Sequence, residues 1–267
     1  MRKLAVLSIL TFIAVTFSGC VVTNRKPANN DGYMEDIELS GDKINNNGIS
    51  EESGNKTEQE NEMTVQNAYM DILRQIYDAL EFDAQSVDDN NEYYSIGIHE
   101  IAMYLDTPSD RRKAISYCIL DINQDGIEEL LIVDSNDNGA FEMRILDMYT
   151  WEDGTAIKVI EGWSRNRFYL LDDGTIYNEG SGGAAYSIMQ LFVFEPRGTE
   201  LTEKDLYFTY PKNENMDETG YYYSKDGIYD VSQAIEITAE ECHEVVNTWQ
   251  ERIIKLEMKT IDTVGEK

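Results

Sequence analysis

Hydrophobic and polar residues alternate along much of the chain from Ala114 onward, and pairs of turn-forming residues interrupt the alternation at short intervals. A period of two is typical of β-strands with one buried face, and Asp-Gly or Asn-Gly pairs between such runs favour tight hairpins. The turn pairs are Asp125-Gly126, Asn138-Gly139, Asp153-Gly154, Asp173-Gly174 and Asp226-Gly227. The runs between them predict strands over 117–120, 130–133, 143–149, 155–160, 167–171, 186–194, 206–210 and 228–231. Successive hairpins predict a mostly antiparallel meander sheet.

Helical spacing flanks this region on both sides. Before it, Thr64 is placed to cap one helix, and a second helical pattern ends before Pro108. After it, Thr238 and Glu241 have the spacing of a capping box, and an apolar stripe follows them. The sequence therefore predicts one α+β domain over residues 63–262, with N-terminal helices and a C-terminal helix packed on the sheet.

The first 20 residues have the pattern of a signal peptide. Arg2 and Lys3 give a positive start, an apolar run of about 14 residues follows, and small residues precede Cys20. A run of this length is short for a membrane span. The segment resembles a bacterial lipoprotein signal, although Phe17 replaces the usual leucine. The resemblance implies anchoring at the extracytoplasmic face of the cell membrane through lipid, such as palmitate, on Cys20. A plain secretory signal and an anchor helix are the alternatives.

Residues 21–62 are rich in Asn, Gly, Glu and Asp and poor in aromatic residues. Such a segment buries too little apolar surface to offset its ordering entropy, so it predicts a disordered acidic tether. We expect residues 263–267 to form a disordered tail as well. The chain of 267 residues has a formal net charge of -29, which excludes nucleic acid as a partner because phosphate binding depends on Lys and Arg.

A loop crowded with carboxylates separates two short apolar runs between Tyr117 and Val133. Alternate residues of a tight loop can direct their oxygens to one centre, and Gly126 supplies a backbone conformation that a Cβ resists. The predicted Ca²⁺ ligands are the side chains of Asp121, Asn123, Asp125 and Glu129 and the carbonyl of Ile127. The site would be structural, with a weak affinity of about 10⁻⁴ to 10⁻³ M.

The loop departs from the helix-loop-helix calcium motif, because Ile132 stands where that motif needs a bidentate glutamate. The aliphatic runs on either side are short and indicate buried strands instead of helices. The loop therefore resembles the strand-loop-strand calcium loops of integrin-type propeller repeats, over about nine residues. The alternative is a solvated Asp-Gly hairpin that binds no ion.

A second loop repeats the spacing with less charge, at Asp134, Asn136, Asn138, Gly139 and Glu142. A plain hairpin turn at Asn138-Gly139 explains the same residues, so metal binding there stays open. The two loops lie at opposite ends of one predicted strand, and they cannot share an ion.

Other residues give weaker indications. Cys118 and Cys242 lie in apolar patterns typical of buried free thiols, with a disulfide between them as the alternative. The basic residues 111–113 form either a site for an acidic ligand or a solvated turn. The glycine-rich run 180–183 lacks the Lys-Ser/Thr of a phosphate loop, which favours a hairpin connection. Aromatic residues could stack on sugars or peptides if they share an exposed face, or lie half-buried in the sheet: Trp151, Trp163, Tyr186 and 221–223.

As a whole, the chain resembles a group of uncharacterised bacterial cell-surface lipoproteins that share a lipobox, a polar tether and a calcium-type loop. The segment 172–185, DDGTIYNEGSGGAA, carries this resemblance most strongly. The group implies no activity. We therefore expect a binding or structural protein with a glycan or protein ligand. The alternative is an extracytoplasmic hydrolase that acts on glycans or cell-wall material through paired carboxylates.

Overall fold

The computed structural model describes residues 52–82, 93–135 and 143–265, and of residues 52–63 it describes the backbone only. The predicted signal peptide, with Cys20, and residues 21–51 of the predicted tether lie outside this part of the chain. None of the helices within the described ranges is long and apolar enough to span a bilayer.

Within the described residues, one sheet of 11 strands forms the centre of the fold, and every strand pair in it is antiparallel. The strands are β1 (Ile115–Leu120), β2 (Glu129–Asp134), β3 (Ile145–Glu152), β4 (Thr155–Glu161), β5 (Asn166–Leu170), β6 (Ile176–Gly183), β7 (Tyr186–Phe194), β8 (Leu201–Pro211), β9 (Thr219–Ser224), β10 (Ile235–Ile237) and β11 (Lys259–Thr260). Their order is β10-β9-β8-β7-β6-β5-β3-β2-β1-β11, and β4 pairs with β3 beside this path. The predicted antiparallel meander is confirmed.

Strand β2 shows why the region from Tyr117 to Val133 lies in the core. Leu130 and Ile132 pack into the cluster formed with the N-terminal helices, whereas Leu131 and Val133 pack into a second cluster on the other face. All four side chains are fully buried. A strand that is covered on both faces needs a continuous apolar run instead of an alternating one, and this confirms the prediction of a buried strand.

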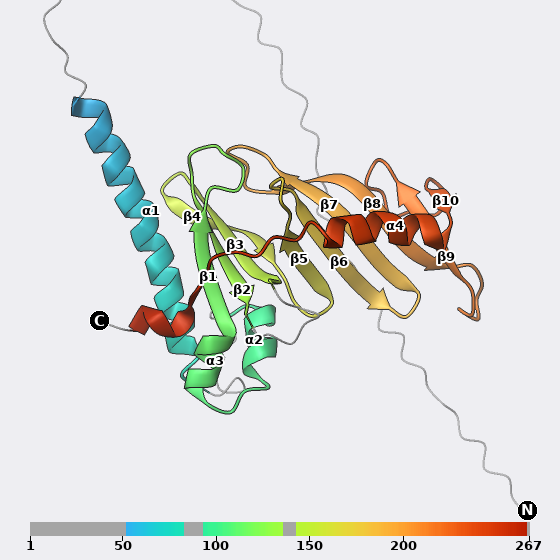
Figure 1. The fold of residues 1–267 in the computed structure, drawn as a ribbon, viewed down its shortest axis with the longest axis horizontal. Coiled ribbons are helices and arrows are strands. Elements are labelled where there is room, and N and C mark those ends of the chain that lie inside the picture. The colour runs from blue at the N-terminus through green and yellow to red at the C-terminus, as the bar shows by residue number, and fades with distance from the viewer. Residues whose placement is uncertain (1–51, 83–92, 136–142, 266–267) are drawn as a thin grey trace, which may run out of the picture. The chain divides into compact units, whose positions relative to one another are not determined.

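The described helices are α1 (Glu52–Ala79), α2 (Ile96–Ala102), α3 (Pro108–Ala114), α4 (Ala239–Gln250) and the 3₁₀ helix η2 (Ile261–Gly265). Figure 1 shows α1, α2 and α3 beside β1 to β4, and α4 in front of β6 to β9. Helix α4 begins with the predicted capping box, in which Thr238 and Glu241 exchange both hydrogen bonds. Its Cys242 and Trp249 are buried against sheet residues that include Tyr177.

Two predicted boundaries are wrong. Helix α1 begins at Glu52, so residues 52–62 are helical and do not belong to a disordered tether. Buried residues such as Tyr69 and Ile76 stabilise the helix by packing on the core. Once a helix has formed, each residue added at its N-terminal end gains a hydrogen bond at little cost, and residues 52–62 include several good helix formers. At the other end, η2 continues to Gly265 with Ile261 fully buried, so the predicted tail at 263–267 is ordered to residue 265.

The predicted turn around residues 111–113 is helix α3. The side chain of Thr107 accepts a hydrogen bond from the Asp110 N–H, and Pro108 occupies the first turn, where its missing N–H needs no partner. Pro108 therefore stands after the end of one helical pattern and at the beginning of the next helix.

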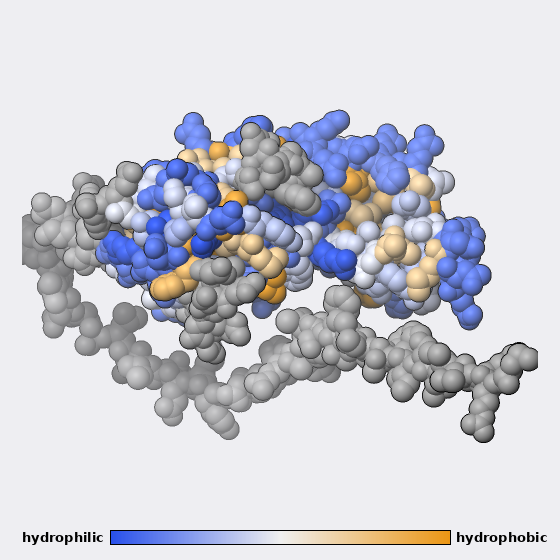
Figure 2. Space-filling model, turned by 90° about the horizontal axis from the view of Figure 1, so that it is seen from below, coloured by the Kyte–Doolittle hydropathy of each residue, from blue (hydrophilic) through white to orange (hydrophobic). Residues whose placement is uncertain are grey.

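Figure 2 shows a mostly hydrophilic surface with scattered apolar side chains, as the formal net charge of -29 predicts.

Candidate metal centre

The acidic loop, residues 121–129, joins β1 to β2 in a hairpin whose last pair is Leu120 opposite Glu129. The predicted strand-loop-strand arrangement is therefore confirmed. Gln124 and Gly126 have φ values of 59° and 89°, and these left-handed conformations turn the chain tightly within the loop. A Cβ at Gly126 would meet no atom within 4 Å, so glycine is favoured there by its backbone conformation and not by lack of space.

The first three predicted ligands turn toward the N–H groups of the loop. The Asp121 carboxylate accepts hydrogen bonds from Asp125 N at 3.1 Å and from Gly126 N at 3.0 Å. Asn123 Oδ1 accepts a second bond from Asp125 N at 3.2 Å, and Asp125 Oδ1 accepts one from Ile127 N at 2.7 Å. The three side chains are half-buried. The acidic loop is thus organised by its own side-chain oxygens, and these do not fan outward into solvent.

Glu129 is the fully buried member of the group. Its Oε2 accepts a hydrogen bond from Ile122 N and its Oε1 accepts one from the Thr150 hydroxyl, both at 3.0 Å. The pKa of Glu129 is raised to about 7, because burial and the negative charges of Asp125 and Asp121 raise it more than the two hydrogen bonds lower it. None of these influences, all from described residues, is a positive charge.

The acidic loop also contacts the turn between β7 and β8. Asn123 Nδ2 donates to Glu195 O at 3.1 Å, and Asp125 Oδ2 accepts from Arg197 N at 2.6 Å. Arg197, whose N–H makes the second of these bonds, has a left-handed backbone conformation with a φ of 58°. Two segments 72 residues apart in the sequence are joined by these bonds.

The chemistry of the donors suits Ca²⁺, because all the predicted ligand atoms are oxygens and three of the side chains are carboxylates. Over the described residues, however, no three His, Cys, Asp or Glu side chains converge closely enough to hold a metal ion. Glu129 points to Ile122 and Thr150. Binding of an ion therefore requires a local change of side-chain conformation within the acidic loop.

Of the positions singled out in the second predicted loop, the structure describes only Asp134, because residues 136–142 lie outside the described ranges. Asp134 is buried at the end of β2, and its Oδ2 lies 3.1 Å from Arg144 Nη2 in an ion pair.

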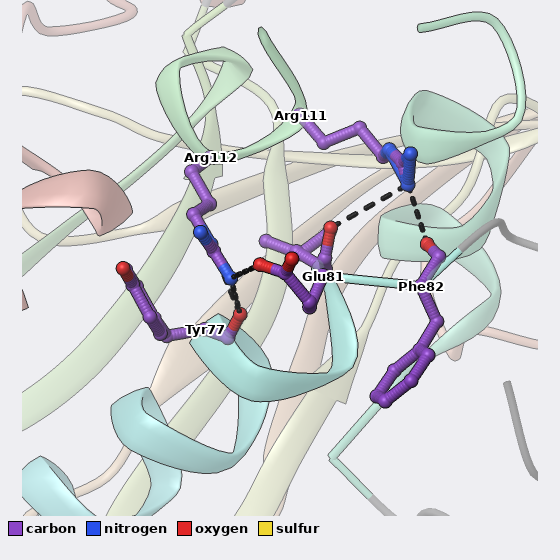
Figure 3. A network of polar contacts seen from close by, with 6 residues as sticks. Tyr77, Glu81, Phe82, Arg111 and Arg112 are labelled. Carbon is purple, nitrogen blue, oxygen red and sulfur yellow. Dashed lines mark hydrogen bonds and ion pairs between the residues drawn. The ribbon is translucent and has the colours of Figure 1, made fainter. Parts of the chain in front are cut away.

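The predicted basic cluster is part of the fold (Figure 3). Arg111 is buried and donates to the carbonyls of Leu80 and Phe82 at the end of α1. Arg112 donates twice to the Tyr77 carbonyl at 3.1 Å and pairs with Glu81 at 2.7 Å. Carbonyls at a helix C-terminus lack partners within the helix, and cations are favoured there. The guanidinium groups of both arginines are therefore used to dock α3 on α1.

Cys118 and Cys242 are free thiols. Burial raises the pKa of each to about 11, so both remain protonated and unreactive at neutral pH. The glycine-rich run 180–183 lies at the end of β6, where a side chain on Gly180 would collide with Ile188. The two cysteines and the glycine-rich run are therefore structural, which is the interpretation that the sequence favours.

The aromatic residues singled out from the sequence do not share one face. Tyr221 packs under α4, whereas Tyr222 packs with Phe208 in a separate cluster. Tyr210 and Tyr229, which sequence reasoning passed over, are 38% and 43% exposed. Tyr210 stands two residues after Phe208 on β8, so the strand period gives a faint indication that the two share a face. The sequence gives no such indication for Tyr229.

Sequence reasoning also passed over Asp147, a fully buried carboxylate on β3. Lys158 Nζ lies 3.3 Å from its Oδ1. Burial raises the pKa of Asp147 above its usual range against the opposing effect of Lys158. Its position inside the sheet and its charge partner indicate a structural ion pair.

Comparisons of the chain with protein-family models, with curated proteins and with solved structures found no match.

Proposed function

We propose that this protein is a lipid-anchored extracytoplasmic binding or structural protein whose acidic loop binds a structural Ca²⁺. The observation that carries the calcium proposal is the fully buried Glu129, whose pKa is raised in part by Asp121 and Asp125. Burial disfavours the ionised form of a carboxyl, and a cation bound beside the carboxyl favours that form. Outside the cell, Ca²⁺ is the cation for which oxygen-rich loops of weak affinity are suited.

The proposed anchor is lipid on Cys20, which lies outside the described residues. It is supported by the basic start, the short apolar run and the small residues that precede Cys20. Two acyl chains hold a protein stably on a bilayer, whereas one is marginal.

The proposed role of the ion is to stiffen the contact between two distant parts of the sheet. Asn123 and Asp125 contact the β7–β8 turn through Glu195 O and Arg197 N. An ion bound by the same two side chains would fix them in place and lower the repulsion between Asp121 and Asp125. The β1–β2 hairpin and the β7–β8 turn would then separate less readily.

Calcium is expected to raise the melting temperature of the full-length protein, measured in a sugar-free non-ionic detergent at pH 7.5. An affinity between 10⁻⁴ and 10⁻³ M gives about 1.4 to 2.7 kcal/mol of stabilisation at 10 mM ion, or about 3 to 10 °C for a domain of this size. Thermal circular dichroism measures the shift, and a chelator should reverse it.

The matched control is the double variant Asp121→Asn plus Asp125→Asn. Each asparagine keeps one side-chain oxygen as an acceptor and loses the second, so one of the two N–H bonds accepted at Asp121 and one of the two accepted at Asp125 are lost. The variant removes two negative charges and should lose the calcium shift, and circular dichroism shows whether it is folded. Equal melting temperatures of the unaltered protein with and without 10 mM Ca²⁺ would refute the metal proposal.

The alternative function, a hydrolase with paired carboxylates, gains no support from Glu129 and Asp147, two carboxyls with raised pKa; burial also raises the pKa of a third carboxyl, the half-buried Glu203. Glu129 and Asp147 are both fully buried, and burial is the first cause of each raised pKa. A general acid must reach the substrate, whereas these two groups face neighbouring protein atoms.

A further inference from the structure

Strands β7, β8 and β9 carry an aromatic layer on the face opposite α4. On the α4 side, Tyr207 and Tyr221 pack in one cluster with Trp249. The alternate positions face the other way, where Phe208 and Tyr222 pack in a cluster of their own. Ile188, Phe208 and Tyr222 lie opposite one another across the three strands, and Tyr210 lies opposite Gly220.

Three tyrosines form the outer part of this layer, and we call Tyr186, Tyr210 and Tyr229 the tyrosine face. The Tyr210 ring centroid lies 5.3 Å from that of Tyr186 and 6.4 Å from that of Tyr229. The Tyr229 ring rests on Phe208 at 4.5 Å, and Phe208 is fully buried. Tyr210 and Tyr229 are 38% and 43% exposed, so their rings lie on the core and remain open to solvent.

A hydrogen bond holds Tyr229 of the tyrosine face in place, and others tie together the strands that carry Tyr186 and Tyr210. The Tyr229 hydroxyl donates to Thr209 O at 3.3 Å. The Thr209 hydroxyl donates to Ala185 O at 3.0 Å and accepts from Ser187 N at 2.9 Å. Beside Tyr210, the Tyr222 ring covers Gly220, where a Cβ would lie 2.5 Å from the Tyr222 hydroxyl. Aromatic side chains fixed in this way lose little entropy when they bind a ligand.

The three side chains of the tyrosine face carry no charge, although the protein has a formal net charge of -29. The pKa of Tyr229 is raised to about 12 by burial first, and then by the nearby hydroxyls of Tyr210 and Tyr186. No carboxylate is among these causes, and phenols are neutral at physiological pH. An anionic polymer would be repelled by the protein as a whole, and a neutral ligand would lose no ion solvation at this face.

We propose that the tyrosine face binds a neutral oligosaccharide. This inference rests on the proposed function as a cell-surface binding protein and names its ligand class. The apolar faces of sugar rings can stack on exposed aromatic rings, and clustered phenol hydroxyls can donate to and accept from sugar hydroxyls. Three side chains provide a platform for a few sugar rings, whereas a stable protein partner needs about 20 to 30 residues on each side.

Isothermal titration calorimetry of the full-length protein, in a sugar-free non-ionic detergent with Ca²⁺, tests the proposal. The probes are maltohexaose, cellohexaose, chitohexaose and xylohexaose, each at up to 5 mM. At least one should bind, and Tyr210→Ala should weaken it about tenfold or more because a stacked ring is lost. Tyr210→Phe keeps the ring and should retain most of the affinity.

Tyr104→Ala is the matched control, since Tyr104 is 81% exposed and follows α2, outside the aromatic layer. It should bind as the unaltered protein does. Tyr229→Ala is a second test, and circular dichroism shows whether each variant is folded. The inference is overturned if none of the four sugars binds, or if folded Tyr210→Ala and Tyr229→Ala variants bind equally well. A peptide that binds through Tyr210 where no sugar does would also overturn it.

Failure here and failure of the calcium proposal can be told apart. Absence of sugar binding in a protein whose melting temperature still rises with Ca²⁺ removes the ligand class and leaves the metal site. Sugar binding that is equal with Ca²⁺ and with chelator, without any melting shift, removes the metal site and leaves the tyrosine face.

Discussion

Without calcium, the protein is expected to lose about 3 kcal/mol of stability through Glu129 as the pH rises from 4.5 to above 7. The folded pKa of this carboxyl is about 7, raised by burial from the ordinary value of 4.5. Between the two values the folded state binds more protons than the unfolded state, so the free energy of unfolding falls as the pH rises. Above the folded pKa the buried carboxylate is ionised, and the loss is complete.

Glu129→Gln isolates this contribution from all other titrating groups. Glutamine keeps the side-chain volume and an acceptor for the Thr150 hydroxyl, and it does not ionise. Urea unfolding from pH 4 to 8 should show the stability of the unaltered protein falling relative to the variant. A constant difference across this range would mean that the Glu129 carboxyl does not titrate near pH 7.

Calcium should abolish the same loss, because an ion bound beside Glu129 favours its ionised form. By linkage, the affinity for Ca²⁺ should fall about tenfold for each pH unit below 7 while Glu129 is protonated. Calcium titrations at pH 5.5, 6.5 and 7.5 measure this dependence. An affinity that does not change with pH would exclude Glu129 as a ligand, even if the acidic loop binds the ion.

The local elements of this fold were predictable because their signals lie within a few residues. The Thr238 capping box and the strand 186–194, which is β7, follow from capping chemistry and from alternation. The hairpin around Gly126 follows from the turn residues and the two apolar runs. Segment 228–231 has the residues of a strand but is irregular, because it folds over the aromatic layer and β10 takes the edge position beside β9.

The contacts that define the candidate sites depend on distant segments, and no local pattern contains them. The sequence predicts the acidic loop but not its bonds to Glu195 and Arg197, because these bonds span 72 residues. Tyr186 and Tyr210 meet because β7 pairs with β8, and Tyr229 joins them from an irregular segment. Tertiary pairing decides which alternate residues share a face, and a single sequence does not state it.

The second large effect is expected at Arg111, where Arg111→Met should destabilise the protein by about 2 to 4 kcal/mol. Arg111 is 5% exposed, and its guanidinium donates to the carbonyls of Phe82, Leu80 and Asp106. Methionine fills much of the space but donates nothing, so buried carbonyls at the end of α1 lose their donor. Thermal unfolding should show a melting temperature lower by about 5 to 15 °C.

Lys113→Met is the matched control, because Lys113 is an exposed residue of the same helix and the substitution removes the same charge. Its effect should stay within about 0.5 kcal/mol. Arg111→Lys keeps the charge but loses the fork that reaches several carbonyls, so it should fall between the two methionine variants. Equal stabilities of Arg111→Met and Lys113→Met would mean that the Arg111 hydrogen bonds do not stabilise the protein, and that Arg112 and apolar contacts such as those of Ala114 and Ile115 hold α3. A large difference would identify Arg111 as a link that docks α3 on α1.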